Sequence, residues 1–581
     1  MVTAKPEYAL GTPSTSVQVE SPYSTLVSRR HQMFPVLSAS DIAHVRRFGV
    51  VQHFHRGEML FRSGEVAAGM YILLTGRVET FSRDGLGRSR LFAQHHVGNF
   101  VAEIAQLSGK PALLDACATT DVDALVIPTE RLPALIIAEA ELGERLMRAM
   151  ILRRVGLIEE GRGPILVGFP GDAKLVALEG FLRRNSYPNT VIDAGNDDEA
   201  IALLRSASVA SHDLPLVLCP GGTLLRSPDT GQLASYLGLL PEFQATHVYD
   251  VAIVGAGPAG LATAVYAASE GLSVVMFDQR APGGQAGTSA RIENFFGFPT
   301  GISGHALAAR AFDQALKFGV HVGIPVNVCA LRREANMFMI DLDSGRRAAS
   351  RCVVIASGAS YRRPPIPGIE SYEGRGVYYW ASPIEAKLCR DEDVALVGGG
   401  NSAGQAVAYL AAHVNRVHLF IRGASLRSRM SQYLADRVAS LENVEVHRAC
   451  SIHELEGDES GLTAIGFRAG GESQRQRLSL RRLFLFVGAD PKTDWLRLSG
   501  VGVDANGFIV TAASGARDLT IERSPALSLE TDVPGVFAVG DVRAGSTKRV
   551  AAAVGDGALA VSQIHEYLCR TSQHPESINP C

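Results

Sequence analysis

Two glycine-rich turns, each placed between an apolar strand and a helix, constrain the fold of this chain most. The first lies in YDVAIVGAGPAGLATAVYAASEGLSVVMFDQR (249–280), where Gly255, Gly257 and Gly260 follow an apolar strand. Gly255 allows the tight turn, Gly257 lets the backbone approach a pyrophosphate, and Gly260 lets helix and strand pack closely. The second strand ends in Asp278, which is placed to accept hydrogen bonds from a ribose. An ordinary glycine turn is the alternative, but strand, helix and terminal acid together favour a dinucleotide site.

The second turn repeats this arrangement with a different charge pattern. VALVGGGNSAGQA (394–406) supplies Gly398, Gly400, Asn401 and Ser402 to another strand, turn and helix. The strand that follows, HLFI, ends in Arg422, with Arg427 close behind. Guanidinium groups suit a 2′-phosphate, so NADPH is favoured over NADH, and a solvated basic helix start is the alternative. Two such sites suggest FAD in the first and a nicotinamide in the second, with hydride transfer between them.

Length and composition narrow the class of protein. The chain has 581 residues and a mass of 61.9 kDa, which predicts about three to five domains. The formal net charge of -3 gives no basic surface for a nucleic acid partner. No apolar run approaches the roughly 18 residues that span a bilayer, and the N-terminus lacks the apolar core of a signal peptide, so we expect a cytoplasmic protein without a membrane partner. The eight cysteines show neither C-x-x-C nor metal-ligand spacing, which predicts reduced thiols and no metal site.

The pattern of strands and helices predicts a multidomain fold. We expect residues 1–33 to be a disordered tail and 34–160 to be a β roll with helices at its ends. Residues 163–242 alternate in the order βαβαββα, which predicts an α/β sandwich. From Tyr249 to about Leu568 a long α/β region holds both glycine-rich turns, which predicts two Rossmann-like domains.

Residues 249–568 resemble the bacterial thioredoxin reductases over the whole length of that family. The matching segments are GAGPAG, GGQ (283–285), RIENFFGFPTGISG (291–304), VVIASGASYRRPPIPG (353–368), GGGNSA, LFLFVGADPKTDW (483–495) and VPGVFAVGDVRAGSTKRVAAAVGDGALAV (533–561). The resemblance implies a three-layer FAD-binding domain made of 249–372 and 488–568. It also implies an NADPH-binding domain, 373–487, inserted between these two parts.

The resemblance also implies which residues hold the cofactors. Asp541 is expected on the ribityl or ribose hydroxyls of FAD. The segment STKRVAAAV opens a helix just after the Gly-Asp turn, and its positive N-terminus can hold negative charge on a reduced flavin. Beyond the residues of the two turns, the expected cofactor-binding residues are Pro258, Ala259, Gly284, Gln285, Asn294, Ala356, Ser357, Gly358, Gly540, Asp541, Lys548, Arg549 and Val550.

The catalytic dithiol of that family is missing from this sequence. Thioredoxin reductases carry Cys-Ala-Thr-Cys after a Gly-Val-x-Tyr strand, whereas GVYY (376–379) is followed here by Trp380, Ala381, Ser382 and Pro383. The acid that follows the pair is replaced by Ile384. Disulfide exchange needs a thiolate and a resolving sulfur, so no catalytic residue is assigned at this site. Cys389 and Cys581 are candidates for a redox relay in place of the missing pair, but each is a single thiol. Trp380 is either an aromatic lid over the flavin or a hydrophobic plug.

Two appended segments resemble other families. Residues 34–160 resemble the cyclic-nucleotide-binding domain, which implies that Glu103 meets a ribose 2′-hydroxyl. That family's glycine and phosphate-binding arginine are replaced by Ala102 and Ala112, and Asp115 adds negative charge, so we expect no cyclic-nucleotide binding. Residues 163–242 resemble the thioredoxin fold, with Pro215 at the place of its cis-proline but without the active-site cysteines. This segment is expected to be redox-silent.

Three hypotheses about function follow. The first is a flavoenzyme that passes hydride from NADPH to FAD and then electrons to an unidentified small molecule or redox protein, as ferredoxin (flavodoxin)–NADP reductases do, with NADH as a second possible donor. The second is a thioredoxin-disulfide reductase that uses a dithiol from another chain. The third is a non-catalytic flavin or nucleotide sensor. We also expect a homodimer, in which the N-terminal domain either regulates the enzyme by binding a small ligand or serves as a docking and dimerisation platform.

Overall fold

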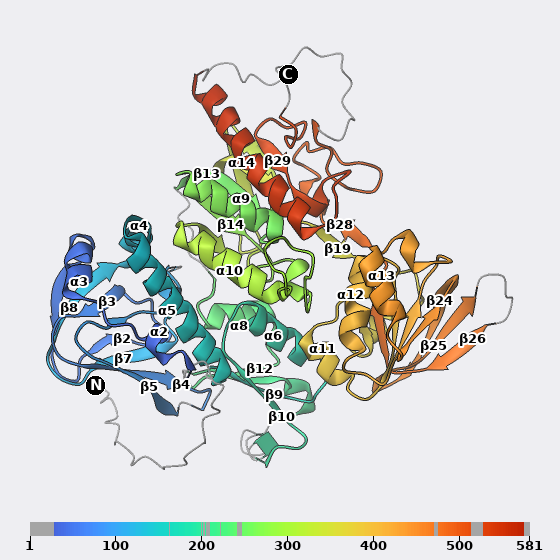
Figure 1. Ribbon diagram of the computed structural model, residues 1–581, viewed down its shortest axis with the longest axis horizontal. Helices are drawn as coiled ribbons and strands as arrows, with labels where there is room; N and C mark the ends of the chain where they lie inside the picture. Colours follow the sequence, from blue (N-terminus) through green and yellow to red (C-terminus); the bar gives the residue numbers. More distant parts are fainter. Residues whose placement is uncertain are drawn as a thin grey trace, which may run out of the picture.

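An antiparallel β roll and its helices form the first unit of the chain (Figure 1). One sheet has the order β1 (Val50–Phe54), β8 (Val122–Pro128), β3 (Gly69–Leu73), β6 (Phe100–Val101). The other has the order β2 (Met59–Phe61), β7 (Leu114–Ala118), β4 (Val78–Arg83), β5 (Ser89–His95). The helices are α2 (Arg30–Met33), α3 (Ala39–Val45), α4 (Leu132–Ala138) and α5 (Ala140–Glu159).

The roll begins earlier than the sequence predicts. The computed structural model describes residues 28–573 except 87, 108, 162, 199, 202–203, 205–209, 221, 241–246, 470–474 and 513–526. Met33 at the end of α2 is fully buried, and its carbonyl accepts a hydrogen bond from Arg153 Nε of α5 at 2.9 Å. The expected disordered tail is therefore wrong for residues 30–33, while residues 1–27 and Cys581 lie outside the described residues.

A small α/β unit follows the roll. Its sheet has the order β10 (Thr190–Asp193), β9 (Ile165–Gly168), β11 (Leu216–Leu218), β12 (Leu224–Arg226). β9 and β10 are parallel, and the other pairs are antiparallel. Its described helices include α6 (Ala173–Arg184), which Asp172 caps by accepting from Leu175 N at 2.9 Å, and α8 (Thr230–Tyr236). The Leu214–Pro215 bond is cis. The second helix of the expected order βαβαββα, which the sequence places at 198–207, falls largely on residues that are not described.

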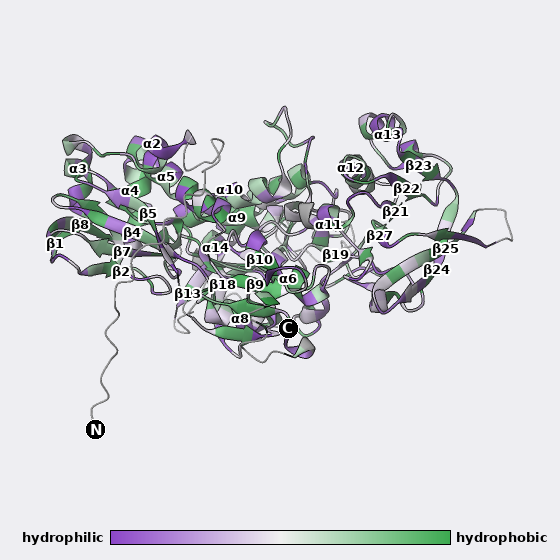
Figure 2. Cartoon of the chain, turned by 90° about the horizontal axis from the view of Figure 1, so that it is seen from below, coloured by the Kyte–Doolittle hydropathy of each residue, from purple (hydrophilic) through white to green (hydrophobic). Residues whose placement is uncertain are grey.

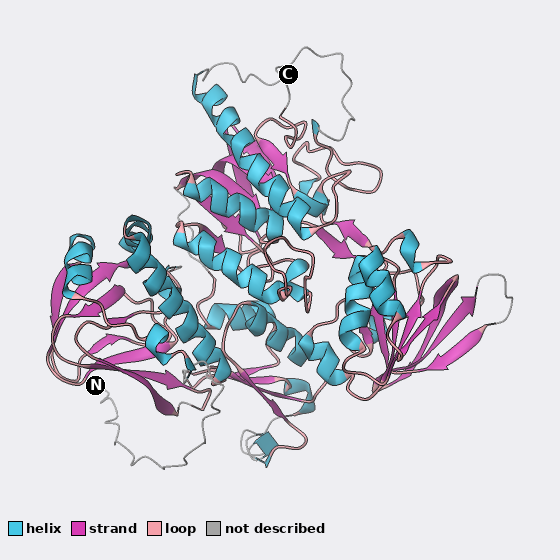
Figure 3. Cartoon of the chain, in the orientation of Figure 1, coloured by secondary structure: helices cyan, strands magenta, loops and turns pink. Residues whose placement is uncertain are grey.

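The third unit is built on a mostly parallel sheet. Its path is β15 (His321–Gly323), β14 (Val274–Phe277), β13 (Val248–Val254), β18 (Arg347–Ile355), β17 (Met337–Leu342), β16 (Val328–Glu334), and β29 (Val536–Ala538) pairs with β18. The helices α9 (Pro258–Ser269), α10 (Gly304–Lys317) and α14 (Val550–Gln573) lie beside this sheet (Figure 3). Strands buried on both faces read as continuous apolar runs, which explains the sequence of β13 and β14.

A second Rossmann-like unit is inserted into the third. Its parallel sheet has the order β20 (Val377–Tyr378), β27 (Arg482–Leu485), β21 (Asp393–Val397), β22 (Arg416–Phe420), β23 (Val444–His447). Its helices are α11 (Pro383–Leu388), α12 (Asn401–Leu410) and α13 (Gln432–Ala439). An antiparallel sheet of β24 (Cys450–Asp458), β25 (Gly461–Ala469) and β26 (Gln476–Ser479) covers one side. β19 (Ala359–Tyr361) and β28 (Ala489–Pro491) join the two units. Ile366 and Ile369 already pack in the inserted core, upstream of the expected boundary at 373.

The roll and the third unit share one buried core, and hydrogen bonds join the second unit to both. One buried core runs from Leu135 and Leu146 of the roll's helices to Leu316 and Val320 at the end of α10. In Figure 1 the second unit lies below α10, between the roll and the inserted unit. Figure 2 shows hydrophobic residues gathered in the central strands around β9 and β18. Within the described part of the chain, no helix combines the length and apolar character needed to cross a bilayer.

Candidate functional site

A cavity of about 410 Å³ opens at the carboxyl ends of β13, β14 and β18. Ligands of open α/β sheets bind at this edge of the sheet. The predicted site residues that line it are Gly257, Pro258, Ala259, Asp278, Gly284, Gln285, Asn294, Ala356, Ser357, Gly358, Asn401, Ser402, Asp541, Lys548, Arg549 and Val550. Those that lie outside its wall are Gly255, Gly260, Gly398, Gly400, Arg422, Arg427 and Gly540.

The glycines of the first turn have separate physical roles. A Cβ on Gly255 would lie 2.2 Å from Ala356 O, and one on Gly260 would lie 1.9 Å from Gly255 O. Both positions are closed by backbone packing. Gly257 precedes α9, and the nearest atom to its Cβ position is the Gly284 Cα at 3.9 Å. Gly257 and Gly284 therefore form a bare backbone cradle at the positive N-terminus of α9, which suits a pyrophosphate.

Asp278 is fixed by backbone donors just beyond β14. Its Oδ2 accepts from Ala256 N at 2.9 Å, and its Oδ1 accepts from Arg280 N at 2.9 Å and from Ala281 N at 3.2 Å. Lys492 lines the same cavity. Burial lowers the pKa of the Lys492 ammonium, with Arg280 acting in the same direction, while the Asp278 carboxylate opposes the shift. The wall thus offers both an acceptor for hydroxyls and cations for phosphate.

The far end of the cavity carries an acid and a lysine at the start of α14. Burial raises the pKa of Asp541, and the Lys548 ammonium opposes that shift. Lys548 Nζ donates to Asp541 O at 2.6 Å and lies 4.3 Å from the ring centroid of Phe508. Gly540 N donates to Asp556 Oδ2 at 3.0 Å, so Gly540 shapes the turn and does not line the cavity. A bare glycine cradle, a fixed acid, the positive N-terminus of α9 and the basic residues before α14 fit a dinucleotide such as FAD.

The second turn meets the same cavity from the inserted unit. Gly398 has φ +157°, and a Cβ there would lie 2.7 Å from Phe486 O, so this glycine is a packing position. Asn401 Oδ1 accepts from Ser431 N at 2.7 Å, which fixes the start of α12 at the cavity wall. Arg422 is exposed just beyond β22. Arg427 forms an ion pair with Asp436 at 2.6 Å.

Trp380 stands between this cavity and a second one of about 250 Å³. Its Nε1 donates to Glu385 Oε1 at 2.8 Å, and Ser382 N donates to Glu385 Oε2 at 2.9 Å. Glu385 is 2% exposed. The acid missing at residue 384 is thus present one residue later, turned toward the indole at the start of α11. Sequence reasoning missed this residue because it compared only the aligned position.

The described cysteines do not line either cavity. Cys389, the nearest to Trp380 along the chain, is fully buried in the core of the inserted unit, and burial raises the pKa of its thiol to about 12. A thiol of this kind is inert.

In the structure Glu103 accepts hydrogen bonds from its own loop, which the sequence did not predict. Its Oε1 accepts from Leu113 N at 2.9 Å and from Leu114 N at 3.0 Å, and the residue is 2% exposed. Burial raises the pKa of this carboxyl. Asp115 is neutralised by an ion pair with Arg83. Oε1 of Glu103 thus closes its own loop, whereas the buried Oε2 has no hydrogen-bond partner among the described residues, and contact with a ribose stays a prediction.

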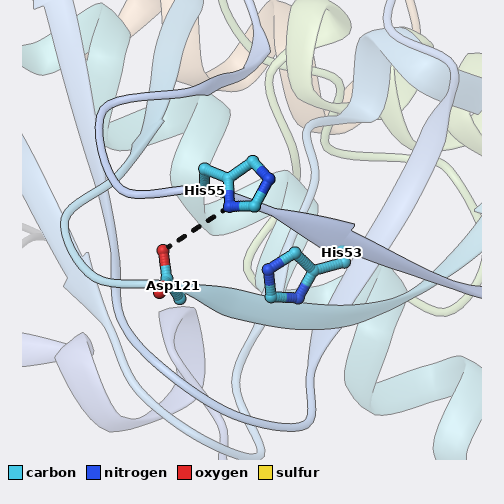
Figure 4. Close-up of side chains that lie close together, drawn as sticks. All are labelled: His53, His55 and Asp121. Atoms are coloured by element: carbon cyan, nitrogen blue, oxygen red, sulfur yellow. Dashed lines mark ion pairs between the residues drawn. The ribbon is translucent and has the colours of Figure 1, made fainter.

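Two groups of possible metal ligands lie elsewhere in the described residues. Figure 4 shows the exposed side chains of His53, His55 and Asp121, whose ligand atoms lie within 4.8 Å of one another. His53 Nδ1 instead contacts Asp123 Oδ1 at 2.8 Å, and His55 Nδ1 lies 3.9 Å from Asp121 Oδ1. The other group is His418, Glu445 and His447. Ion pairs account for these clusters, and the expectation of no metal stays a prediction.

Several lining residues were not among the predicted site residues. Tyr361, Tyr379, Gln405 and Lys492 reach the wall from strands, loops and α12, far apart in the chain. Lys492 stands in a segment that matches the thioredoxin reductases, so that resemblance could have found it. Arg184 comes from the second unit, and no motif of the Rossmann units could reveal it.

Comparisons with known proteins agree with this geometry. Residues 249–557 match the pyridine nucleotide-disulphide oxidoreductase family, and residues 51–139 match the cyclic nucleotide-binding domain. The chain is 30% identical over 321 residues to a thioredoxin reductase of Listeria innocua serovar 6a, covering 55% of this chain and 94% of that protein. It is 30% identical over 314 residues to a thioredoxin reductase of Mycoplasmopsis pulmonis, covering 54% of this chain and 95% of that protein.

A solved structure gives the same relationship. The thioredoxin reductase of Lactococcus lactis in the FR conformation has a TM-score of 0.51 and 27% identity, covering 55% of this chain and 99% of that one. Members of this family use FAD and NADPH. With a family match across more than half of its length and a dinucleotide cradle to explain it, the chain belongs to the pyridine nucleotide-disulphide oxidoreductase family and is a thioredoxin reductase-like, FAD-dependent NAD(P)H oxidoreductase.

Proposed function

We propose that this enzyme takes hydride from NADPH and passes the electrons to an acceptor outside the chain, without an internal dithiol. The observation that carries the proposal is Trp380, which lines both cavities at the position where the resemblance expects the first thiol. An indole that donates to a buried carboxylate cannot exchange with a disulfide. Cys389 is too deeply buried to replace it.

The residues around the cavity have distinct tasks in this proposal. When bound, FAD supplies an acceptor for hydride and a donor to the second acceptor. Gly257 and Asp278 hold the pyrophosphate and a ribose. Lys548, at the start of α14, offsets negative charge at the other end of the cavity. Trp380, which lines both cavities, excludes water from the wall between them.

The second cavity offers the acceptor a place to bind. Its apolar side includes Trp380, Tyr409 and Phe486. At its rim, Arg437 Nη1 of the inserted unit donates to Glu293 Oε1 of the FAD-binding unit at 2.7 Å. Such a mixed wall suits a small planar oxidant or the edge of a redox protein's cofactor. A thioredoxin served by the dithiol of another chain is the alternative acceptor.

Thiol counting after reduction tests the absence of an internal dithiol. The purified holoenzyme is treated anaerobically with excess NADPH, unfolded, and titrated with a thiol reagent beside an untreated sample. We expect flavin absorbance to bleach within seconds and the number of thiols to stay unchanged. A gain of two thiols per chain would show a redox-active disulfide and overturn the proposal. Unbleached flavin would instead favour the sensor hypothesis.

The acceptor is then identified by turnover. The NADPH-reduced enzyme is mixed with ferredoxin, flavodoxin, thioredoxin, a quinone or oxygen, and the rate of flavin reoxidation is measured for each. We expect fast reoxidation by an acceptor that needs no dithiol. Reoxidation only by thioredoxin together with an added dithiol protein would support the alternative.

We infer that the two N-terminal units serve docking and regulation. The strand order of the second unit supports a thioredoxin-like fold. The loop 169–172 reads Phe-Pro-Gly-Asp, so this unit has no thiol at the usual place. The buried Glu103 supports a first unit that acts without a cyclic nucleotide. A cytoplasmic location and a homodimer remain predictions.

A further inference from the structure

The second unit contributes a side chain to the FAD cavity. Arg184 is the last residue of α6, and it lines the cavity together with Gly257, Asp278 and Gly284. The two Rossmann units that define the family fold do not include α6. The cavity wall is therefore completed by a domain outside the family's own boundaries.

The described contacts of Arg184 use only part of its hydrogen-bonding capacity. Its Nη2 donates to Gly284 O at 3.1 Å, whereas its Nε is buried and has no hydrogen-bond partner among the described residues. Burial lowers the pKa of the guanidinium, and the Asp278 carboxylate opposes that shift. A guanidinium stays charged at neutral pH and carries five N–H donors. A charged guanidinium with unused donors at the wall of a cavity suits an anionic ligand.

The neighbours of Arg184 hold it in place. Asn185 Nδ2 donates to Arg280 O at 3.0 Å, and His305 Nε2 donates to Arg183 O at 3.0 Å. On the other side, Arg154 Nη1 of the roll donates to Ser186 O at 3.3 Å. The end of α6 is thus fixed between the roll and the FAD-binding unit. A side chain held this way is preorganised for a ligand.

We propose that Arg184 binds a phosphate group of FAD, so that the second unit is part of the cofactor site. Gly284, whose carbonyl accepts from Arg184, lies against Gly257 in the cradle at the start of α9. A phosphate in that cradle lies within the reach of the guanidinium. The proposal rests on FAD occupying this cavity, and its competitor is a structural role in which Arg184 serves only Asp278 and the docking of α6.

The test is FAD affinity in matched variants of the full chain. Arg184→Met should weaken binding of FAD to the apoprotein by about 10- to 100-fold, measured by flavin fluorescence. Arg184→Lys should keep part of the affinity because it retains the charge. Arg183→Met is the control, because this exposed side chain does not line the cavity. Asn185→Ala removes one docking hydrogen bond but keeps the guanidinium, so it should weaken FAD binding less than Arg184→Met does.

ADP is a second ligand that separates a phosphate contact from a general effect. ADP shares the adenosine and phosphate part of FAD but has no flavin, so Arg184→Met should weaken ADP and FAD alike. Unchanged affinities in Arg184→Met, or an equal loss in Asn185→Ala, would overturn the proposal in favour of the docking role. Loss of ADP affinity smaller than about twofold would also overturn it. A wild-type apoprotein that cannot be reconstituted with FAD would instead refute the cofactor assignment itself.

Discussion

The indole nitrogen of Trp380 donates to the carboxylate of Glu385 at 2.8 Å, across the first turn of α11. The other carboxylate oxygen accepts from Ser382 N at 2.9 Å and from the Ser382 hydroxyl. Glu385 therefore caps α11 and fixes the indole in one step. Under the proposed function, this closed hydrogen-bonded turn stands in place of a dithiol.

Removing the carboxylate should destabilise this turn and spare the cavity. Glu385→Gln places an amide donor against Ser382 N, so we expect the free energy of unfolding to fall by about 1–3 kcal/mol. Urea denaturation of the holoenzyme measures this change. Flavin reduction by NADPH should continue, because Glu385 does not line either cavity. Glu370→Gln, an exposed acid 3.7 Å from Arg363, is the matched control. Equal stability of the two variants would contradict the capping role.

The two glycines of the first turn should respond differently to alanine. Gly257 has φ −72° and an open Cβ position, so Gly257→Ala should leave apoprotein stability unchanged while weakening FAD binding at least about tenfold. Gly260→Ala would place its Cβ 1.9 Å from Gly255 O and should lower the free energy of unfolding by about 2 kcal/mol or more. Urea denaturation of the apoproteins and titration with FAD measure the two effects. Loss of stability in both variants would refute the assignment of Gly257 to the cofactor.

Most elements of the two Rossmann-like units could be predicted from local sequence patterns. The strand, turn and helix around Gly257 lie where the sequence predicts them, because the apolar run of β13, the glycines and α9 are adjacent in the chain. Asp278 could be placed for the same reason, since it follows the next strand. These features depend on short-range geometry, which one sequence contains.

Features that depend on long-range packing could not be predicted from the sequence. Arg184 reaches the cavity only because the second unit docks on α10, and no local pattern encodes that docking. Glu103 occupies the place expected from the resemblance, yet its loop folds back so that Leu113 N and Leu114 N both donate to its Oε1. A motif fixes which residue stands at a position, while its partners come from the tertiary fold.

Coenzyme preference should depend more on Arg422 than on Arg427. Arg422 is exposed beyond β22, whereas Arg427 is already paired with Asp436. Losing a guanidinium contact with a 2′-phosphate costs about 1.5–3 kcal/mol, so Arg422→Ala should raise KM for NADPH about 10- to 100-fold and leave KM for NADH nearly unchanged. Arg427→Ala should have a smaller effect, and Asp436→Asn, which frees Arg427, should lower KM for NADPH. Equal changes for both coenzymes would defeat the assignment of NADPH.

Cyclic nucleotides should not bind to the first unit. Ala112 stands where that family has its arginine, and it is 2% exposed, so a cyclic phosphate finds no cation there. Isothermal titration of the holoenzyme with cAMP or cGMP should give no binding heat at micromolar concentrations. Saturable binding with a Kd below about 10 μM, an affinity near −7 kcal/mol, would show that another group replaces the arginine.

The β roll should lose stability in mild acid because of His95. Burial, with Arg153 as a further cause, holds the pKa of this histidine well below its usual value of 6.5, and its Nε2 contacts Thr80 Oγ1 at 3.2 Å. In the unfolded chain His95 binds a proton near pH 6.5, whereas in the folded chain it stays neutral at that pH. The contribution of His95 to the free energy of unfolding is therefore complete above about pH 6.5. It decreases as the pH falls below that value, by at most about 1.4 kcal/mol per pH unit.

His53 has the opposite effect on the pH dependence of stability in the same unit. Its hydrogen bond with Asp123 raises its pKa, so its contribution is present below pH 6.5 and lost as the pH rises through the folded value. Native-state hydrogen exchange in β4 and β5 between pH 5 and 8, corrected for intrinsic rates, measures both effects. His95→Gln should flatten the acid loss of protection, whereas His53→Asn should leave that loss in place. An acid loss that survives in His95→Gln would assign it to another buried group.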